Sequence, residues 1–253
     1  MTTTGGLVLA AALLMWSPVV TACGSSEQPL EPSPIGAHSS GGAPEPEAPE
    51  GMRLVGLRQV VVAVPDSWGT DETRCLKPIA DTVFEDTGGV TRCVYPEPTA
   101  DELSGVSSLA VVRLETGYGK HLLEQMHAAD PVAGPEVLES DLGCLDKLPP
   151  ACSQAFAVPS EGVAFVVQVE KGSSAKTVRT IRSSLQVLPA NYTTVPFIAY
   201  GTSMKFAERR LADAGLVGTA RDVEFPHYFT GTVPVAGSVV PAGGAVEMTI
   251  GDG

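Results

Sequence analysis

The chain has 253 residues, of which 43% are hydrophobic and 6% aromatic, and its net charge at pH 7 is −13. This length allows one or two domains. A strongly acidic protein repels phosphate backbones, so the charge argues against nucleic acid as a partner and leaves neutral and zwitterionic ligands open. The five cysteines are an odd number, which in an exported protein needs an explanation.

The N-terminal segment is predicted to be an export signal. Leu7 to Val20 is mostly apolar; it is shorter than the roughly 20 residues of a membrane span but suits a signal peptide. It ends in Val20-Thr21-Ala22-Cys23, which resembles the lipobox of bacterial lipoproteins. The resemblance implies that residues 1–22 are removed and that Cys23 carries a lipid. That lipid would anchor the chain to the outer face of the cytoplasmic membrane.

Two alternatives to the lipobox remain. The segment MTTTGG, which precedes the apolar run, contains no Lys or Arg, although export signals usually begin with basic residues. The run could therefore be an ordinary secretory signal followed by a chance cysteine, or a buried apolar helix. Assigning Cys23 to a lipid leaves an even number of cysteines, which favours the lipoprotein hypothesis.

Residues 23–51 are predicted to form a disordered tether. Gly24 to Gly51 contains six prolines and five glutamates but no Lys, Arg or aromatic residue. Such a segment cannot bury enough apolar surface to offset the entropy lost on ordering. We expect it to hold the folded part of the chain away from the membrane.

Residues 52–194 are predicted to form an α+β domain outside the cytoplasm. The apolar runs 57–65, 107–115 and 161–170 are typical of strands, and in the last of these Val163, Phe165, Val167 and Val169 alternate on one side. Helical patterns cover 120–128 and 175–188. The frame VAVPDSW near the start and VRTIRSSLQVLP near the end resembles exported PsbP-like domains, a likeness that assigns no functional residue.

Four cysteines fall in this region, and we expect the disulfides Cys75–Cys93 and Cys144–Cys152. Three pairings are possible, but each of these pairs flanks a turn-rich loop. An oxidising compartment favours disulfides, and the spacing includes no CxxC, so we expect no zinc site.

Several patterns resemble catalytic or metal motifs without completing them. Ser173 to Lys176 matches S-x-x-K, but the S-D-N and K-T-G elements that accompany it in penicillin-binding enzymes are missing. Gly117 to Lys120 lacks the first glycine of a phosphate loop and is expected to be a turn.

Two clusters of polar side chains are interpreted as solvated surface. His121, Glu124 and His127 would fan too widely on one helix to hold a metal ion. Asp81, Glu85 and Asp86 lack the ligand spacing of a calcium loop. We therefore predict no catalytic residue, no metal and no cofactor.

The C-terminal region, residues 195–253, resembles a PASTA domain, the small module found in penicillin-binding proteins and bacterial Ser/Thr kinases. The segment VPFIAYGTSMKFAERRLADAGL carries Val195-Pro196, Gly201 and Ala214-Gly215-Leu216, and GSVVPAGGAVEMTI supplies the second block. The family implies a helix, three strands and, in some members, peptidoglycan binding. Gly201 lies one residue late, and the segment between Gly231 and Gly237 is about four residues short for the family.

Together these features favour a lipid-anchored envelope protein with a non-catalytic binding or organising role. Peptidoglycan is the expected ligand, bound through the PASTA-like domain, and no protein partner is indicated. Two alternatives stay open. One is an envelope enzyme with its cleft near Asp66, Trp68 or His121, and the other is a structural spacer that binds nothing.

Overall fold

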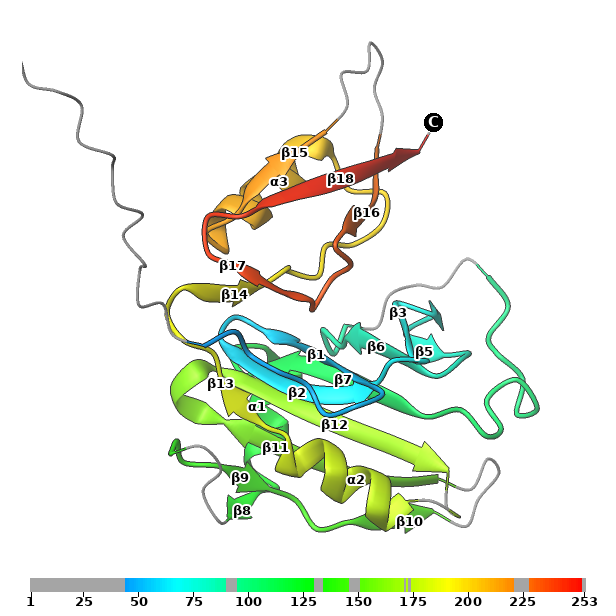
Figure 1. The fold of residues 1–253 in the computed structure, drawn as a ribbon. Helices are drawn as coiled ribbons and strands as arrows, with labels where there is room; N and C mark the ends of the chain where they lie inside the picture. Colours follow the sequence, from blue (N-terminus) through cyan, green and yellow to red (C-terminus); the bar gives the residue numbers. More distant parts are fainter. Residues whose placement is uncertain are drawn as a thin grey trace, which may run out of the picture. The chain divides into compact units, whose positions relative to one another are not determined.

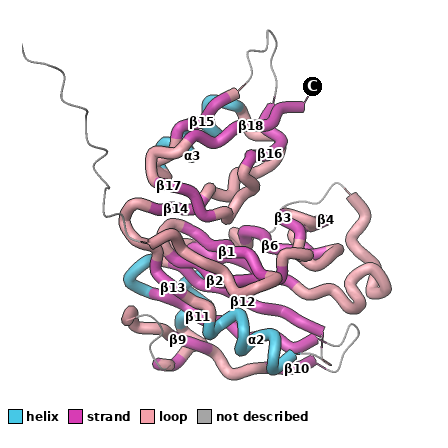
Figure 2. The backbone as a smooth tube through the Cα atoms, viewed as in Figure 1, coloured by secondary structure: helices cyan, strands magenta, loops and turns pink. Residues whose placement is uncertain are grey.

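A computed structural model describes residues 44–89, 95–129, 134–145, 151–170, 172, 174–220 and 228–251. Residues 42–253 belong to one compact unit. The fold is α+β and consists mostly of strands, with three α-helices in the described part (Figures 1 and 2). This confirms the expected fold class. Cys23 and residues 1–43 lie outside the described residues.

An eight-stranded sheet is the centre of the region before residue 192. Its path runs β3-β6-β7-β12-β11-β9-β8, with β10 paired to β11. The β3–β6 and β6–β7 pairs are parallel, and the other pairs are antiparallel. The strands are β3 (Gly69–Thr70), β6 (Thr82–Glu85), β7 (Ser108–Arg113), β8 (His127–Ala128), β9 (Leu138–Glu139), β10 (Gly143–Leu145), β11 (Ala151–Val158) and β12 (Val163–Glu170).

A smaller sheet has the order β1-β2-β13, formed by β1 (Met52–Leu57), β2 (Val60–Pro65) and β13 (Gln186–Val187). The predicted strand at 57–65 is wrong at its start, because the chain turns at Arg58 and Gln59 and Leu57 ends the preceding strand. Arg58 adopts a φ of 57°, the left-handed conformation that a tight hairpin turn requires.

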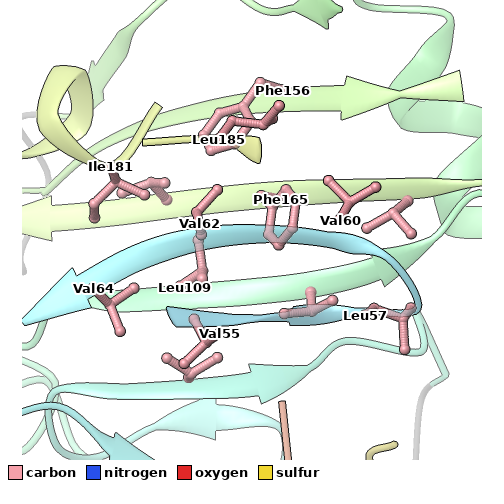
Figure 3. Packing of buried hydrophobic residues seen from close by; sticks show 14 of the residues in the cluster. Val55, Leu57, Val60, Val62, Val64, Leu109, Phe156, Phe165, Ile181 and Leu185 are labelled. Carbon is pink, nitrogen blue, oxygen red and sulfur yellow. The ribbon is translucent and has the colours of Figure 1, made fainter. Parts of the chain in front are cut away.

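The predicted alternation along β12 is confirmed, and it places different residues on the two faces of the sheet. Phe165, Val163, Val167 and Val169 join the main apolar cluster with β1, β2 and α2 (Ser174–Ser183). Phe156 of β11 lies with its ring centroid 5.4 Å from that of Phe165, and Figure 3 shows this cluster. Ala164 belongs to a second cluster with Val112, Leu114 and Ala157, against which Tyr118 and Leu122 of α1 (Gly117–Leu123) pack.

Both predicted helices exist but differ in extent from the prediction. The first begins at Gly117, where Thr116 caps it by accepting a hydrogen bond from the Gly119 amide, and it ends at Leu123. The second ends at Ser183, after which Leu188 donates a backbone hydrogen bond to Gln59 at 2.7 Å. Leu185 and Leu188, at the end of the predicted helix, are nonetheless buried, although this part of the chain is not helical.

Short elements complete the region before residue 192. β4 (Thr73–Arg74) and β5 (Lys77–Pro78) form a small antiparallel pair, and a 3₁₀ turn, η1, spans Pro159–Glu161.

The C-terminal region contains one helix and two small sheets. β14 (Tyr192–Thr194) pairs with β17 (Val239–Pro241), and the second sheet has the order β15-β18-β16. Its strands are β15 (Val217–Thr219), β16 (Tyr228–Val233) and β18 (Ala245–Gly251), with β15 parallel and β16 antiparallel to β18. Ala207 and Leu211 of α3 (Met204–Asp213) are buried in a separate apolar cluster with Val246 and Met248.

The C-terminal region contacts the rest of the unit through β1 and the turn after it. Gly56 donates a backbone hydrogen bond to Gly237 at 3.0 Å. The Thr194 hydroxyl donates to the carbonyl of Arg58 at 3.1 Å. Phe197 belongs to the main apolar cluster rather than to the C-terminal one. These contacts bring residues 70–87 and 196–249 to the two sides of one pocket.

Candidate functional site

A pocket of 710 Å³ lies between these two stretches of chain and is the candidate ligand site. One side is formed by residues after β3 and along β6, including Asp71, Phe84 and Glu85. The other side is formed by Pro196 to Tyr200 and by residues of β16 and β18. Its size is typical of small-molecule sites, which are about 300–1,000 Å³.

Asp71 is the acidic residue at the rim of this pocket. The loop that carries it is fixed by Arg53, whose guanidinium donates to the carbonyls of Trp68 and Gly69, each at 3.0 Å. The Asp71 amide also donates to the carbonyl of Val83 at 2.8 Å. Asp71 is exposed and its φ is 60°, a conformation that Asp tolerates better than most residues.

The pKa of the Asp71 carboxyl is raised to about 6, first by desolvation and then by the negative charges of Glu85 and Glu72. Its side chain makes no hydrogen bond or ion pair with any described residue. An accessible carboxyl group without a cationic partner can accept hydrogen bonds from a ligand, or pair with a cationic group on it.

Glu85, the second acidic residue of the pocket, is paired with an arginine. Its carboxylate accepts a hydrogen bond from Nε of Arg113, and the two side chains are only 13% and 17% exposed. Glu85 was predicted to belong to a solvated acidic loop, and that prediction is wrong, because it ends strand β6 and is half-buried. Asp81 and Asp86 instead accept backbone hydrogen bonds from Ser107 and Gly88.

The rest of the lining combines hydroxyl groups with aromatic rings. Six threonines contribute, namely Thr70, Thr73, Thr87, Thr230, Thr232 and Thr249. Phe84, Phe197 and Phe229 are nearly fully buried, whereas Tyr200 is 70% exposed. The hydroxyl of Tyr200 donates to that of Tyr228 at 3.2 Å, and the two rings meet edge to face. The hydroxyl groups of such a surface can hydrogen-bond a polyhydroxylated ligand, and the exposed ring of Tyr200 can stack against an apolar face of that ligand.

The structure does not bring the residues named for an enzyme cleft to this pocket. Trp68 is a core residue with 5% exposure, and Asp66 and His121 are exposed. None of the three lines the pocket. Asp71 stands in no sequence motif and is distinguished only by desolvation and by the charges that folding brings near it, so no pattern in the sequence indicates it.

The structure separates the three residues that were considered as metal ligands, His121, Glu124 and His127. His121 lies on α1 near Glu124 and Gln125, but His127 is in strand β8, where its ring nitrogen is 3.3 Å from Asp141. The hydrogen bond that the ring of His127 donates to the carboxylate of Asp141 is the main cause that raises the pKa of His127. Among the described residues, no group of three His, Cys, Asp or Glu side chains could hold a metal ion.

The remaining motifs are structural. Gly117 to Lys120 is the first turn of α1 rather than a loop turn, and Gly119 is buried against the end of β7. Lys176 lies in α2, whereas Ser173 is outside the described residues. In the described part of the chain, no helix is both long and apolar enough to cross a membrane.

The cysteines confirm one expected disulfide. Cys144 and Cys152 are bonded and lie directly opposite each other on β10 and β11. Cys75 is also disulfide-bonded, while Cys93 lies outside the described residues, so the Cys75–Cys93 pairing stays a prediction.

A scan against protein-family models finds no match to this chain, and a search of curated proteins finds no similar sequence.

Proposed function

We propose that this chain is a lipid-anchored binding protein of the bacterial cell envelope, with the 710 Å³ pocket as its ligand site. The lipobox-like segment ending at Cys23 supports anchoring to the outer face of the cytoplasmic membrane, and the tether 24–51 supports reach into the wall. The PASTA-like segments from Val195 onward support a ligand in peptidoglycan.

The observation that carries this proposal is the chemistry of the pocket lining. Threonine hydroxyls and the carboxyl group of Asp71 line the pocket together with the exposed ring of Tyr200. Sugars present the matching surfaces, since their hydroxyls hydrogen-bond while their ring C–H faces stack on aromatic side chains. A phosphate-rich ligand would meet the charge of Asp71 and the overall charge of −13. The pocket therefore favours the glycan portion of the wall over its anionic polymers.

Co-sedimentation of the full chain, in detergent, with insoluble peptidoglycan tests the proposal. Tyr200→Ala removes a pocket side chain that is 70% exposed, and Tyr95→Ala removes an equally large side chain that is 69% exposed and lies outside the pocket. We expect the wild type and Tyr95→Ala to pellet alike and Tyr200→Ala to lose at least three-quarters of its pelleted fraction. Failure of the wild type to pellet at physiological salt would refute peptidoglycan as the ligand.

A catalytic role is the second candidate, and the raised pKa of Asp71 is the observation that favours it. A carboxyl group that titrates near neutrality can act as a general acid. The other carboxylate of the pocket, on Glu85, is occupied by Arg113, so a pair of free carboxyls for glycoside hydrolysis is missing from the described lining. Release of soluble fragments from peptidoglycan by the wild type but not by Asp71→Asn would favour the enzyme.

A structural spacer is the third candidate, and it would leave the pocket without a ligand. In that case Tyr200→Ala and the wild type would behave alike in every binding assay.

A further inference from the structure

A second pocket, of 300 Å³, gathers an unusual share of the positive charge of this acidic protein. Arg58, Arg113 and Arg210 all line it, and the whole chain has only 16 Lys and Arg residues against 29 Asp and Glu. They come from the β1–β2 turn, the end of β7 and the last turn of α3. Their sequence positions are far apart, so the fold alone brings them together.

The hydrogen bonds of these arginines leave donors available. Both Nη groups of Arg58 are already used within the protein. Nη1 donates to the carbonyl of Glu161 at 3.1 Å, and Nη2 donates to the carboxylate of Glu115 at 2.8 Å. Arg113 uses only Nε, toward Glu85, so its two Nη groups make no hydrogen bond within the described protein. Arg210 makes no side-chain hydrogen bond or ion pair with any described residue. A guanidinium has five N–H donors in a planar fork that suits a carboxylate.

One group of opposite sign lines the same pocket. Asp213, at the C-terminal end of α3, also makes no side-chain hydrogen bond or ion pair with any described residue. The C-terminus of a helix carries a partial negative charge as well. A simple anion would therefore meet attraction from Arg113 and Arg210 and repulsion from Asp213. A ligand that carries both charges would satisfy the arginines and the aspartate together.

We propose that this pocket binds a small zwitterion, an amino acid or the end of a short peptide, with its carboxylate on Arg113 and Arg210 and its amine on Asp213. The volume of 300 Å³ is at the lower end of the range for small-molecule sites. Arg58, which also lines the pocket, is held in place because its carbonyl accepts a hydrogen bond from the Thr194 hydroxyl and its guanidinium pairs with Glu115. The proposal does not depend on the ligand of the larger pocket.

Isothermal titration of the full chain with dialanine tests the proposal, using two analogues that each remove one charge. We expect millimolar or tighter binding of dialanine, and at least tenfold weaker binding of both N-acetyl-dialanine and dialanine amide. Equal binding of dialanine and N-acetyl-dialanine would overturn the zwitterion assignment. Absence of dialanine binding at 10 mM, about ten times the millimolar dissociation constant expected, would overturn the site itself.

Matched variants on one helix locate the binding. Arg210→Gln is expected to weaken dialanine binding at least tenfold, whereas Arg209→Gln, the neighbouring exposed arginine outside the pocket, is expected to change it less than twofold. Asp213→Asn and Glu208→Gln form a second pair on the same helix. Equal effects within either pair would mean that only the net charge of α3 matters, and that result would contradict the proposal.

Discussion

Glu85 and Arg113 form an ion pair whose two members line different pockets. Glu85 lines the 710 Å³ pocket and Arg113 the 300 Å³ pocket. Since Nε of Arg113 is used toward Glu85, Asp71 is the carboxyl group of the first pocket that has no partner among the described residues, and the Nη groups of Arg113 stay available to the second pocket. The pair therefore links the charge states of both candidate sites.

Breaking this pair should destabilise the fold. Glu85→Gln leaves the half-buried guanidinium of Arg113 without a charged partner, so we expect a loss of about 2–3 kcal/mol in the free energy of unfolding. Urea denaturation measures it. Glu97→Gln, which breaks the exposed pair with Lys77, is the control and should leave the midpoint unchanged. Equal midpoints for the two variants would show that the Glu85–Arg113 pair contributes nothing specific.

Asp71 should make the stability of the protein fall as pH rises through the mildly acidic range. Its pKa in the folded protein is about 6, above the ordinary aspartate value of 3.8, so the native state holds this proton more tightly than the unfolded state. Its contribution to stability is complete below about pH 4, is lost as pH rises from there to about 6, and changes little above that.

Asp71→Asn removes this dependence, and urea unfolding at pH 4 and pH 7 measures the effect. We expect the difference in free energy of unfolding, variant minus wild type, to be larger at pH 7 than at pH 4. A ¹³C titration of the carboxyl signal that disappears in Asp71→Asn gives the pKa directly. A midpoint near 4 for that signal would contradict the prediction.

The contrast between Ile181 and Asp71 shows what the sequence could predict. Val178, Ile181 and Leu185 follow a helical period, and all three are buried, because periodic burial leaves a local record in the sequence. Asp71 leaves none. Its environment depends on Glu85, which the parallel pairing of Gly69 with Thr82 brings close. Long-range register of this kind cannot be read from spacing.

The same reason explains why the arginine pocket was missed. Arg58, Arg113 and Arg210 lie on three elements that meet only after β1, β7 and α3 are in place. Only the C-terminal end of the helix predicted at 120–128 is wrong, for a related reason: pairing of His127 and Ala128 with Leu138 and Glu139 overrides the local helical pattern there.

The Cys144–Cys152 disulfide should contribute measurably to stability. It closes a loop with a sequence separation of 8, for which the loss of chain entropy in the unfolded state corresponds to about 2–3 kcal/mol. The double variant Cys144→Ser, Cys152→Ser should unfold at correspondingly lower urea concentration. An unchanged midpoint would mean that the pairing of β10 with β11 alone holds this edge of the sheet.

Cys23 is predicted to carry the membrane anchor. Cys23→Ala should move the protein from the membrane fraction to the soluble fraction of fractionated cells, because the lipid would no longer be attached. Metabolic labelling with a radioactive fatty acid is the second measurement, and it should label the wild type only. A Cys23→Ala protein that stays in the membrane fraction would contradict the lipoprotein hypothesis.

Gly119 should be required for the packing of α1 against β7. A Cβ atom at this position would lie 2.2 Å from the carbonyl oxygen of Arg113 and 2.6 Å from Cα of Leu114, both backbone atoms that cannot move aside. Gly119→Ala should therefore lower the free energy of unfolding by about 1–3 kcal/mol.

Gly117→Ala is the matched control, because a Cβ there meets nothing within 4 Å. It should leave stability unchanged or raise it by up to about 1 kcal/mol, since alanine favours the helix over glycine. If Gly119→Ala unfolds at the same urea concentration as the wild type, the prediction that close packing of α1 on β7 requires glycine at this position is contradicted.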